Sequence, residues 1–448
     1  MHIRKTSQAV IGLLAAATLL TGLTACSSSS SGSGSTNSGS PSATSSGPVT
    51  MTLWHNATGD QGVAYWQQAV KTFEAANPGV TINIQVVQNE DFDGKLQAAM
   101  AANTTPDIFL QRAGGKLADQ IAAGQVLDIT NLIDPTVKSQ IGNGFAIDTI
   151  DNKIYGMPMN IQPEGFWYSG DLFKQAGVDP ASITDISSLN TAVTALKAAG
   201  GSNWAPIALG AKDAWPAAHW FYQFALRECS QDQATQLASG QLKSLSDPCW
   251  LKALNDLDAF NKTNPWNEGF LTTVGQQGAG SSAGLVANHK AAMELQGAWD
   301  PGVIGGLTPD GKNLPDLGYF PFPAVSGGQG DPSALMVGAD AWSCSAKAPE
   351  PACVNFLNFL GTADQQRLYT QAFSTIPANV NALDAVTDPA TKAAGEAVNK
   401  AKYTVLWFDS ALGQDAGNAI NQAVVGLLAG QLTPDTALAQ MNTALANN

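Results

Sequence analysis

One short segment of the sequence matches the spacing of a catalytic serine. The run GSSAG, from Gly280 to Gly284, fits the pattern G-x-S-x-G with Ser282 at its centre. A nucleophile in this pattern stands on a sharp turn between an apolar strand and a helix. Here the preceding residues, TTVGQQGA, are polar and rich in glycine. The sequence therefore predicts a polar loop around Ser282 and no nucleophile.

Cys26 could carry a different chemistry, covalent attachment of lipid. It follows an apolar run, Val10–Leu20, that is short for a membrane span and is preceded by Arg4 and Lys5, which is typical of a signal peptide. The closing residues LTAC resemble the lipobox of bacterial lipoproteins, in which the thiol takes a diacylglycerol before cleavage. We expect residues 1–25 to be removed and Cys26 to be lipidated; a secretory signal with an incidental cysteine is the alternative.

Residues 26–48 are almost entirely Ser, Gly, Thr and Pro, which predicts a flexible tether. Its root-mean-square reach is roughly 25 Å by the scaling for Gly-rich chains. No later segment reads as a membrane span. The remaining 49–448 is long enough for two domains.

Four further cysteines make an even number in an exported chain, so disulfide pairing is the default among three possible connectivities. Two short loops cost the least chain entropy, so we expect Cys229–Cys249 and Cys344–Cys353. A zinc site is the rival, but no C-x-x-C spacing is present and His55, His219 and His289 are scattered singly. We expect neither a metal nor a cofactor.

Charge narrows the possible partners. The chain has 22 basic and 36 acidic residues, a net charge of −14, and becomes still more acidic without Arg4 and Lys5. An acidic surface repels phosphate backbones, so nucleic acid is not an expected partner. Charged residues make up only 13% of the chain while 11 tryptophans are present, a pattern that favours an uncharged polar ligand.

The start of the folded part alternates strands with helices. Residues 49–56 and 80–87 alternate with a strand period, the second through Val80, Ile82, Ile84 and Val86, and 106–111 is a short apolar strand. Between and after them, 64–76 places apolar residues on one helical face, 93–103 reads as a helix, and 116–130 reads as a helix that leads into a loop. This order predicts an α/β fold with a largely parallel sheet covered by helices on both faces.

The order of several segments resembles a known family. The run LWHNATGD … FEAANPGVTINIQVV … PDIFLQRAGG … AAGQVLDIT … YGMPMNIQPEGFWYSGDLF, followed by AAMELQGAWD, LMVGADAWSCSAKAPE and the C-terminal YTVLWFDSALGQDAGNAINQAVVGLLAGQLTPDTALAQM, is similar to the extracellular solute-binding proteins of carbohydrate ABC importers. This is the family of maltose-binding protein. The resemblance covers essentially everything after the tether.

The resemblance implies a two-lobe periplasmic-binding-protein fold with a hinge and a ligand cleft between the lobes. Lobe one is expected at 49–159 plus 341–386, and lobe two at 160–338 plus 387–448. The hinge crossings are expected at Met157–Gln162, Leu335–Asp340 and near Asp384–Gly395.

The resemblance also implies where the ligand lies. Sugars need flat aromatic platforms and planar polar side chains. Trp299 and Trp407 match the family's stacking aromatics, and Trp215 falls where members often place a third; a core position is the alternative for each. Polar candidates come from strand ends, where open α/β sheets bind ligands: His55, Asn56, Thr58, Asp60, Gln111, Arg112, Asn160, Gln162, Glu164, Asp300, Asp340 and Asp409. His219 is expected in a helix packed under the cleft.

These expectations together describe a lipid-anchored, monomeric receptor on the outer face of the cell membrane. It would bind a di- or oligosaccharide, in the manner of raffinose-type or xylo-oligosaccharide receptors, and deliver it to the permease subunits of an ABC importer without catalysing a reaction. Two alternatives stay open. A lipid-anchored glycoside hydrolase would place two carboxylates about 5 to 10 Å apart around a sugar, and a sensor or adhesin could use the same fold.

Overall fold

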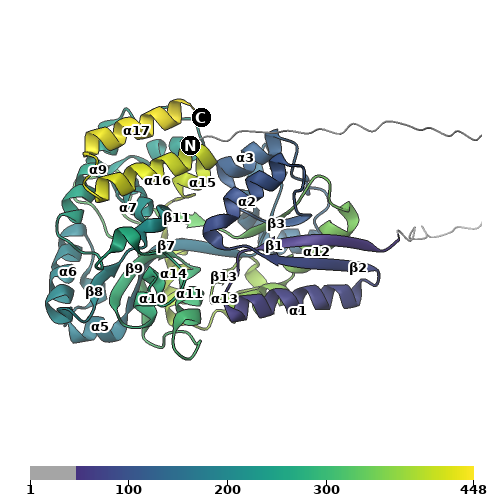
Figure 1. Ribbon diagram of the computed structural model, residues 1–448, viewed down its shortest axis with the longest axis horizontal. Coiled ribbons are helices and arrows are strands. Elements are labelled where there is room, and N and C mark those ends of the chain that lie inside the picture. The colour runs from purple at the N-terminus through teal and green to yellow at the C-terminus, as the bar shows by residue number, and fades with distance from the viewer. Residues whose placement is uncertain (1–46, 448) are drawn as a thin grey trace, which may run out of the picture. The chain divides into compact units, whose positions relative to one another are not determined.

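The computed structural model describes residues 47–447 (Figure 1). The expected signal peptide, Cys26 and nearly all of the expected tether lie outside the described residues. Residues 47–448 form one compact unit, and two large β-sheets organise it. We call the part built on the five-stranded sheet lobe one and the part built on the seven-stranded sheet lobe two.

Lobe one surrounds a sheet with the strand order β2-β1-β3-β12-β6. The strands are β1 (Val49–His55), β2 (Val80–Val86), β3 (Ile108–Gln111), β6 (Met157–Pro158) and β12 (Ala341–Cys344). The helices that share its core are α1 (Asp60–Ala76), α2 (Asn89–Ala101), α3 (Gly114–Ala122), α4 (Pro135–Ile141), α12 (Glu350–Gly361) and α13 (Ala363–Phe373). Figure 1 shows α1 on one side of the β1–β3 strands and α2 and α3 on the other.

Lobe two surrounds a sheet with the path β14-β11-β7-β9-β8, and β10 and β13 also pair with β7. The strands are β7 (Asn160–Ser169), β8 (Ala205–Ala208), β9 (Ala291–Gly297), β10 (Leu317–Phe320), β11 (Leu335–Gly338), β13 (Ile376–Pro377) and β14 (Thr404–Val405). The larger core contains α5 (Gly170–Gln175), α6 (Ile186–Gly200), α7 (Trp215–Glu228), α8 (Gln231–Ala238), α9 (Pro248–Asn261), α15 (Phe408–Ala411), α16 (Gln414–Leu428) and α17 (Pro434–Ala446). A smaller core lies with α10 (Ser282–Ala287), α11 (Asp300–Leu307) and α14 (Pro389–Lys400).

Short elements complete the chain. A hairpin joins β4 (Thr149–Ile150) and β5 (Lys153–Ile154). Five 3₁₀ turns are described: η1 (Gly142–Asp148), η2 (Pro180–Ser182), η3 (Ala211–Asp213), η4 (Phe270–Thr272) and η5 (Val380–Ala385). Among residues 47–447, no helix combines the length and apolar character needed to cross a membrane.

The sequence pattern explains the local structure at the start of the chain. In α1, Tyr65, Trp66, Ala69, Val70 and Phe73 recur at helical spacing, and all five are buried, as predicted. The helix ends before Pro78, whose ring cannot continue it. The predicted alternation in β2 holds less well at its end, because Val86 is exposed and Val87, the next residue, is buried instead.

The predicted largely parallel sheet is wrong in its detail. β1 pairs in parallel with β2 and β3, as expected, but β12 is antiparallel to β3 and to β6. In lobe two, β7 is antiparallel to β9, β10, β11 and β13, while β8–β9 and β11–β14 are parallel. Both sheets are mixed, because the chain crosses from one lobe to the other more than once. β12, for example, joins the first sheet only after the chain has passed through lobe two.

Two short linkers connect strands of the two sheets directly, while Ser374 and Thr375 form a third crossing, from α13 in lobe one to β13 in lobe two. Only Met159 separates β6 in lobe one from β7 in lobe two, and only Ala339 and Asp340 separate β11 from β12. The linkers are hydrogen-bonded to each other, because the Met159 N–H donates to the Asp340 carbonyl at 2.8 Å and the Asp340 N–H donates to Asn160 Oδ1 at 2.6 Å. Figure 1 shows β7 leading from the β1–β3 region towards β9 and β8. The residue boundaries expected for the two lobes stay a prediction.

Both predicted disulfides are present, one in each lobe. Cys229–Cys249 joins the end of α7 to the start of α9, with Cα atoms 5.0 Å apart. Cys344–Cys353 joins β12 to α12, with Cα atoms 6.1 Å apart. Each bond therefore fastens a helix to its neighbouring element within one core.

Candidate functional site

Three tryptophans from distant parts of the sequence meet in lobe two. Trp215 begins α7, Trp299 precedes α11 and Trp407 precedes α15. The ring centroids of Trp299 and Trp407 are 5.3 Å apart and those of Trp215 and Trp299 are 5.9 Å apart, both in edge-to-face arrangement. Such contacts are the preferred geometry of aromatic pairs. The structure thus brings all three predicted platform residues into one cluster, which we call the tryptophan cluster.

Glycine provides the space beneath two of these rings. A Cβ atom on Gly297 would overlap the Trp299 ring, and a Cβ atom on Gly338 would overlap the Trp407 ring. Both glycines lie at the ends of strands, β9 and β11. Each indole therefore lies directly against backbone. The spacing of Gly297 and Trp299 in QGAWD is visible in the sequence, whereas no pattern there pointed to Gly338.

His219 supports Trp407 from a second direction. Its ring stacks on the Trp407 ring with centroids 5.8 Å apart and an interplanar angle of 8°. His219 lies in α7 and is buried, so its predicted placement in a helix is confirmed. Its Nδ1 contacts Glu164 Oε1. Burial lowers the pKa of His219, but the Glu164 carboxylate outweighs burial and the net pKa is raised.

Glu164 belongs to this supporting network. It lies on β7 with no exposed surface, and its other oxygen accepts a hydrogen bond from Gln223 Nε2 at 2.6 Å. Gln223 in turn accepts from Arg227 NH1 at 2.6 Å. The carboxylate therefore holds the ring that supports Trp407 instead of presenting a free oxygen at the surface.

The indole N–H groups of the tryptophan cluster lack hydrogen-bond partners among the described residues, as do those of the core residues Trp220 and Trp342. Within the described residues, Nε1 of Trp215, Trp299 and Trp407 is buried and has no hydrogen-bond partner. A buried donor without an acceptor costs free energy, of the order of 1 to 3 kcal/mol. Three such donors in one aromatic cluster are suited to a ligand that carries acceptor oxygens and apolar faces.

The predicted hinge residues form a tight polar group of their own. Asp340 Oδ2 accepts hydrogen bonds from Gln162 Nε2 at 2.8 Å, Asn160 Nδ2 at 3.2 Å and the Tyr369 hydroxyl at 3.3 Å. Asn160 and Gln162 are buried and Asp340 is half-buried. The structure brings these side chains together, and their mutual bonds fasten the two linkers; their predicted contact with ligand stays a prediction.

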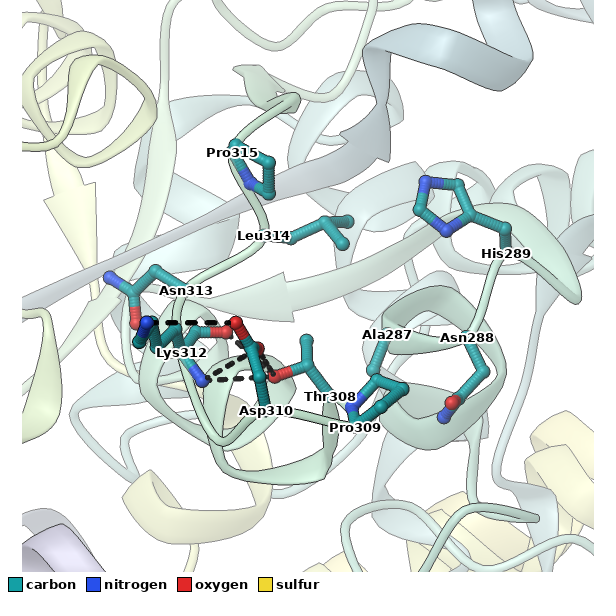
Figure 2. A pocket seen from close by; sticks show the side chains of 10 residues that line it. All are labelled: Ala287, Asn288, His289, Thr308, Pro309, Asp310, Lys312, Asn313, Leu314 and Pro315. Atoms are coloured by element: carbon teal, nitrogen blue, oxygen red, sulfur yellow. Dashed lines mark hydrogen bonds and ion pairs between the residues drawn. The ribbon is translucent and has the colours of Figure 1, made fainter.

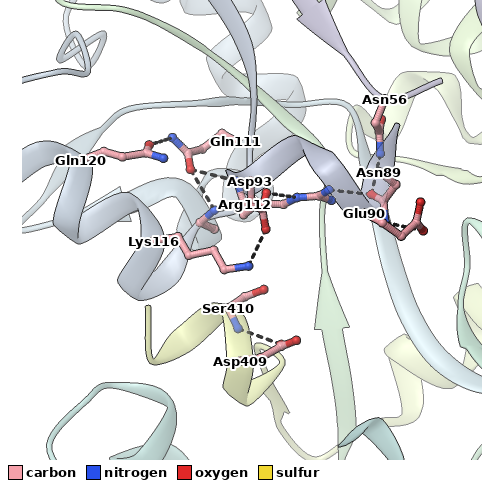
Figure 3. Close-up of polar contacts among 11 residues, drawn as sticks. Asn56, Asn89, Glu90, Asp93, Gln111, Arg112, Lys116, Gln120, Asp409 and Ser410 are labelled. Atoms are coloured by element: carbon pink, nitrogen blue, oxygen red, sulfur yellow. Dashed lines mark hydrogen bonds and ion pairs between the residues drawn. The ribbon is translucent and has the colours of Figure 1, made fainter. Parts of the chain in front are cut away.

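Lobe one contributes a charged network around Arg112 (Figure 3). Arg112 Nε lies 3.2 Å from Asp93 Oδ1, and Lys116 Nζ lies 2.7 Å from Asp93 Oδ2. Although burial alone would raise it, the two cations lower the pKa of Asp93 to about 2. Arg112 NH2 also donates to Asn89 Oδ1 at 2.6 Å, and Asn56 Nδ2 donates to the same oxygen at 3.0 Å. No pattern in the sequence pointed to Asn89, Asp93 or Lys116.

The other predicted polar residues lie apart from the tryptophan cluster or turn inward. Gln111 is fully buried and donates to Gln120 and Ser343. Thr58, which lies just before α1, and Asp60, the first residue of α1, are both exposed. His55 is buried against Trp66, and burial lowers its pKa to about 4.

Asp300 and Asp409 neighbour tryptophans in sequence but are engaged in lobe two. Asp409 accepts from the Ser410 N–H at 2.8 Å and from Asn421 Nδ2 at 3.1 Å. Asp300 is fully buried, and burial together with the nearby Glu294 carboxylate raises its pKa well above the ordinary value. Burial likewise raises the pKa of Glu294 to about 7. This carboxyl pair lies in the smaller core of lobe two, where a proton is held more readily than a charge.

The surroundings of Ser282 differ from the predicted polar loop. Ser281 caps α10, so Ser282 is the first residue of that helix, and Ser282 is fully buried. Its hydroxyl donates to the Gly275 carbonyl at 2.9 Å. Ser282 follows no strand, so the arrangement is a helix start and not a nucleophile elbow.

One histidine that looks isolated in the sequence has acidic neighbours in space. Potential metal-ligand atoms of Asp171, His289 and Asp316 lie within 4.8 Å of one another. Asp316 Oδ2 already accepts from the Ser169 hydroxyl at 2.6 Å and from the Asp171 N–H at 2.9 Å. The hydrogen bonds of Asp316 therefore serve to hold the start of α5.

Two cavities lie in lobe two away from the tryptophan cluster. One of about 430 Å³ is lined by residues of the turn after α10 and of the loop after α11, where Thr308, Asp310 and Lys312 contact one another (Figure 2). The other, of about 220 Å³, lies between α6, α7 and α9. Neither is lined by Trp215, Trp299 or Trp407.

Two α/β lobes joined by paired linkers, with an aromatic cluster beside one linker, define a two-lobe binding protein of the periplasmic type. Residues 56–367 match the family model of the bacterial extracellular solute-binding proteins, and the chain belongs to this family. The sequence is 28% identical over 352 residues to an uncharacterised ABC transporter extracellular-binding protein of Pyrococcus horikoshii, covering 76% of this chain and 73% of the relative. It is 22% identical over 310 residues to a melibiose/raffinose/stachyose-binding protein of Bacillus subtilis, covering 67% of each chain.

Solved structures share the fold. A structure from work on xylan utilisation by Caldanaerobius polysaccharolyticus has a TM-score of 0.80 and 27% identity, covering 88% of this chain and 99% of that one. A chitin oligosaccharide binding protein has a TM-score of 0.78 and 26% identity, covering 89% and 98%. The expected two-lobe fold is therefore confirmed.

Proposed function

We propose that this chain is the receptor of an ABC importer and binds a di- or oligosaccharide between its two lobes. The observation that carries the proposal is the tryptophan cluster, with its three indole N–H groups that lack a partner among the described residues. Sugar rings have apolar C–H faces that pack on indoles and oxygens that accept hydrogen bonds. The cluster offers both kinds of contact.

Relatives and charge support the same ligand class. Uncharged sugars are named as ligands in the names of three similar proteins. One relative is named for melibiose, raffinose and stachyose, another for lactose, and a solved structure for chitin oligosaccharide. The chain is strongly acidic, with a net charge of −14, which disfavours anionic ligands.

We further propose that the receptor is a monomer anchored on the outer face of the cell membrane through a lipid on Cys26. The sequence LTAC and the tether at 26–48 support this part of the proposal. A tether raises the effective concentration of the receptor at its permease, while its reach of roughly 25 Å allows docking. The lobes would follow the expected boundaries, 49–159 plus 341–386 and 160–338 plus 387–448.

A thermal-shift screen tests the proposal. The purified protein is heated with raffinose, stachyose, xylotriose, chitotriose and, as a contrast, citrate. A sugar at one hundred times its dissociation constant should stabilise the protein by about 2.7 kcal/mol. Failure of every sugar to shift the melting temperature would refute the sugar proposal.

The same samples separate the alternatives. Chromatography of the incubated sugars should show them intact, because we propose binding without catalysis. Shortened products would favour the glycoside hydrolase. Sugar binding without uptake by cells that express the importer would favour the sensor or adhesin.

A further inference from the structure

The two lobes touch where α3 begins. Gly114 and Gly115, the first residues of α3, lie against the backbone of Ser410–Gly413, which ends α15 and leads into α16. Leu117 of α3 belongs to the core of lobe one, and Phe408 and Leu412 belong to the larger core of lobe two. We call this meeting of Gly114–Gly115 with Ser410–Gly413 the glycine contact.

The glycine contact is closer than any side chain allows. A Cβ atom on Gly115 would approach the Ala411 carbonyl oxygen to 2.6 Å and the Leu412 carbonyl carbon to 2.8 Å, and it would come closer still to the Gly413 nitrogen. A Cβ atom on Gly114 would lie 2.7 Å from the Ser410 carbonyl oxygen. Backbone atoms cannot rotate away as a side chain can, so a larger residue must push the two segments apart.

The glycine contact adjoins the residues of the candidate site on both sides. In lobe one, Gly114 follows Arg112 by two residues. In lobe two, Trp407 directly precedes α15, and Leu406 beside it reaches to 2.7 Å from the Cβ position of Gly114. Figure 3 shows Asp409 and Ser410 on α15 beside the segment that carries Arg112 and Lys116.

We infer that Gly114 and Gly115 are affinity-determining positions: their lack of side chains lets lobe one close onto the segment that presents Trp407. This inference rests on the proposed function, binding of a sugar between the lobes. A ligand that binds the closed form gains its apparent affinity in proportion to the population of that form. A side chain at the glycine contact lowers this population without touching the ligand.

Three hydrogen bonds between the lobes are of a different kind. Gln61 Nε2 donates to the Gly311 carbonyl at 3.0 Å, Gln277 donates to Glu90, and Asn313 donates to the Ser374 hydroxyl at 2.6 Å. All three are exposed bonds between side chains or from a side chain to a loop, which can rearrange in water. A second tight backbone approach lies elsewhere between the lobes, because a Cβ atom on Gly302 of α11 would lie 2.8 Å from the carbonyl carbon of Phe373, which ends α13. The glycine contact is the one that adjoins Arg112 and Trp407, so it limits how closely these two parts of the candidate site approach each other.

The test compares substitutions at two glycines. Gly115 has no left-handed backbone, so Gly115→Ala and Gly115→Val add volume without backbone strain, unlike changes at Gly114, whose φ is +57°. Gly94 in α2 is the matched control, because a Cβ atom there meets nothing within 4 Å. Calorimetry uses the sugar of the panel that gives the largest thermal shift, and stopped-flow tryptophan fluorescence follows its release.

We expect Gly115→Ala to weaken sugar binding at least about tenfold, or 1.4 kcal/mol, and Gly115→Val to weaken it further. The loss should appear mainly as faster release, since the contact forms on closure. Gly94→Ala should bind as the parent does. The melting temperature of ligand-free Gly115→Ala should stay near that of the parent. Parent-like affinity of Gly115→Val, or a large fall in the melting temperature with unchanged affinity, would overturn the inference.

A second measurement keeps this test separate from the proposed function. Small-angle X-ray scattering on the ligand-free proteins should give a larger radius of gyration for Gly115→Val than for the parent and for Gly94→Ala. If the parent binds no sugar of the panel, the proposed function fails and the scattering result alone decides the inference. Equal radii of the three proteins would then reject it.

Discussion

Truncating the two best-placed tryptophans should separate their roles. Trp299 is partly exposed, whereas Trp407 is only 9% exposed and packs against His219 and Gly338 in the larger core of lobe two. An aromatic anchor in a desolvated site commonly costs about 2 kcal/mol or more of binding on replacement by Ala, which is about thirtyfold in affinity. Trp→Ala in a core costs about 3 to 5 kcal/mol of folding stability.

We therefore expect Trp299→Ala to weaken sugar binding about thirtyfold while the ligand-free protein melts only a few degrees earlier. Trp407→Ala should weaken binding to a similar extent and also lose about 3 kcal/mol of folding stability. A tryptophan that serves only as a platform for ligand would lose little folding stability on truncation, but Trp407 is also packed in the core.

Replacement by Phe isolates the indole N–H. Because Nε1 of each tryptophan has no partner among the described residues, Trp299→Phe and Trp407→Phe lose no internal hydrogen bond. If the ligand supplies the acceptor, each variant should lose about 1 kcal/mol of binding, about fivefold. Calorimetry measures affinity and scanning calorimetry measures stability. Near-normal binding by Trp299→Ala would remove that residue from the site and refute the reasoning from the cluster.

Three further changes have defined outcomes. Burial raises the pKa of Glu294 from 4.5 to about 7, so the folded protein keeps this proton and its stability falls as pH rises through that interval. Above pH 7, Glu294→Gln should be more stable than the parent by up to about 3 kcal/mol. Urea unfolding measures this difference, and a difference that does not vary with pH would contradict the prediction. Cys26→Ser should leave the membrane fraction with sugar affinity unchanged, and continued fractionation with membranes would reject the lipid anchor. Cys229→Ser opens a link between residues 20 apart and should cost about 3 kcal/mol of stability, whereas a parent-like urea midpoint would argue against that contribution.

Local elements were accessible from the sequence because their signals are local. The helical spacing of Tyr65 to Phe73 and the alternation from Val49 to His55 depend only on neighbours along the chain. Strand direction was not accessible. β12 joins the first sheet after nearly two hundred residues in the other lobe, and nothing in AWSC specifies an antiparallel partner. The expectation of a parallel sheet failed at the strands that return.

The candidate site shows the same division. The aromatic residues could be predicted because the sequence segments around them resemble those of a known family. The polar residues could not be sorted, because a carboxylate beside a tryptophan reads alike whether it faces ligand or core. Glu164 on β7 supports His219, and Asp300 shares a buried place with Glu294. Whether such a carboxylate contacts ligand or packs in the core depends on which side of its strand or helix the side chain points to.

Trp407 connects the features that the proposed function requires to move together. Its ring rests on Gly338, two residues before Asp340 in the linker between β11 and β12. Its backbone starts α15, whose end forms the glycine contact with lobe one. A rotation at this linker therefore moves Gly338, which lies against the Trp407 ring, together with the segment Ser410–Gly413 that lobe one contacts. For this reason a sugar packed on Trp407 and a close approach at Gly115 should stabilise the same arrangement of the lobes, although the two contacts share no atom.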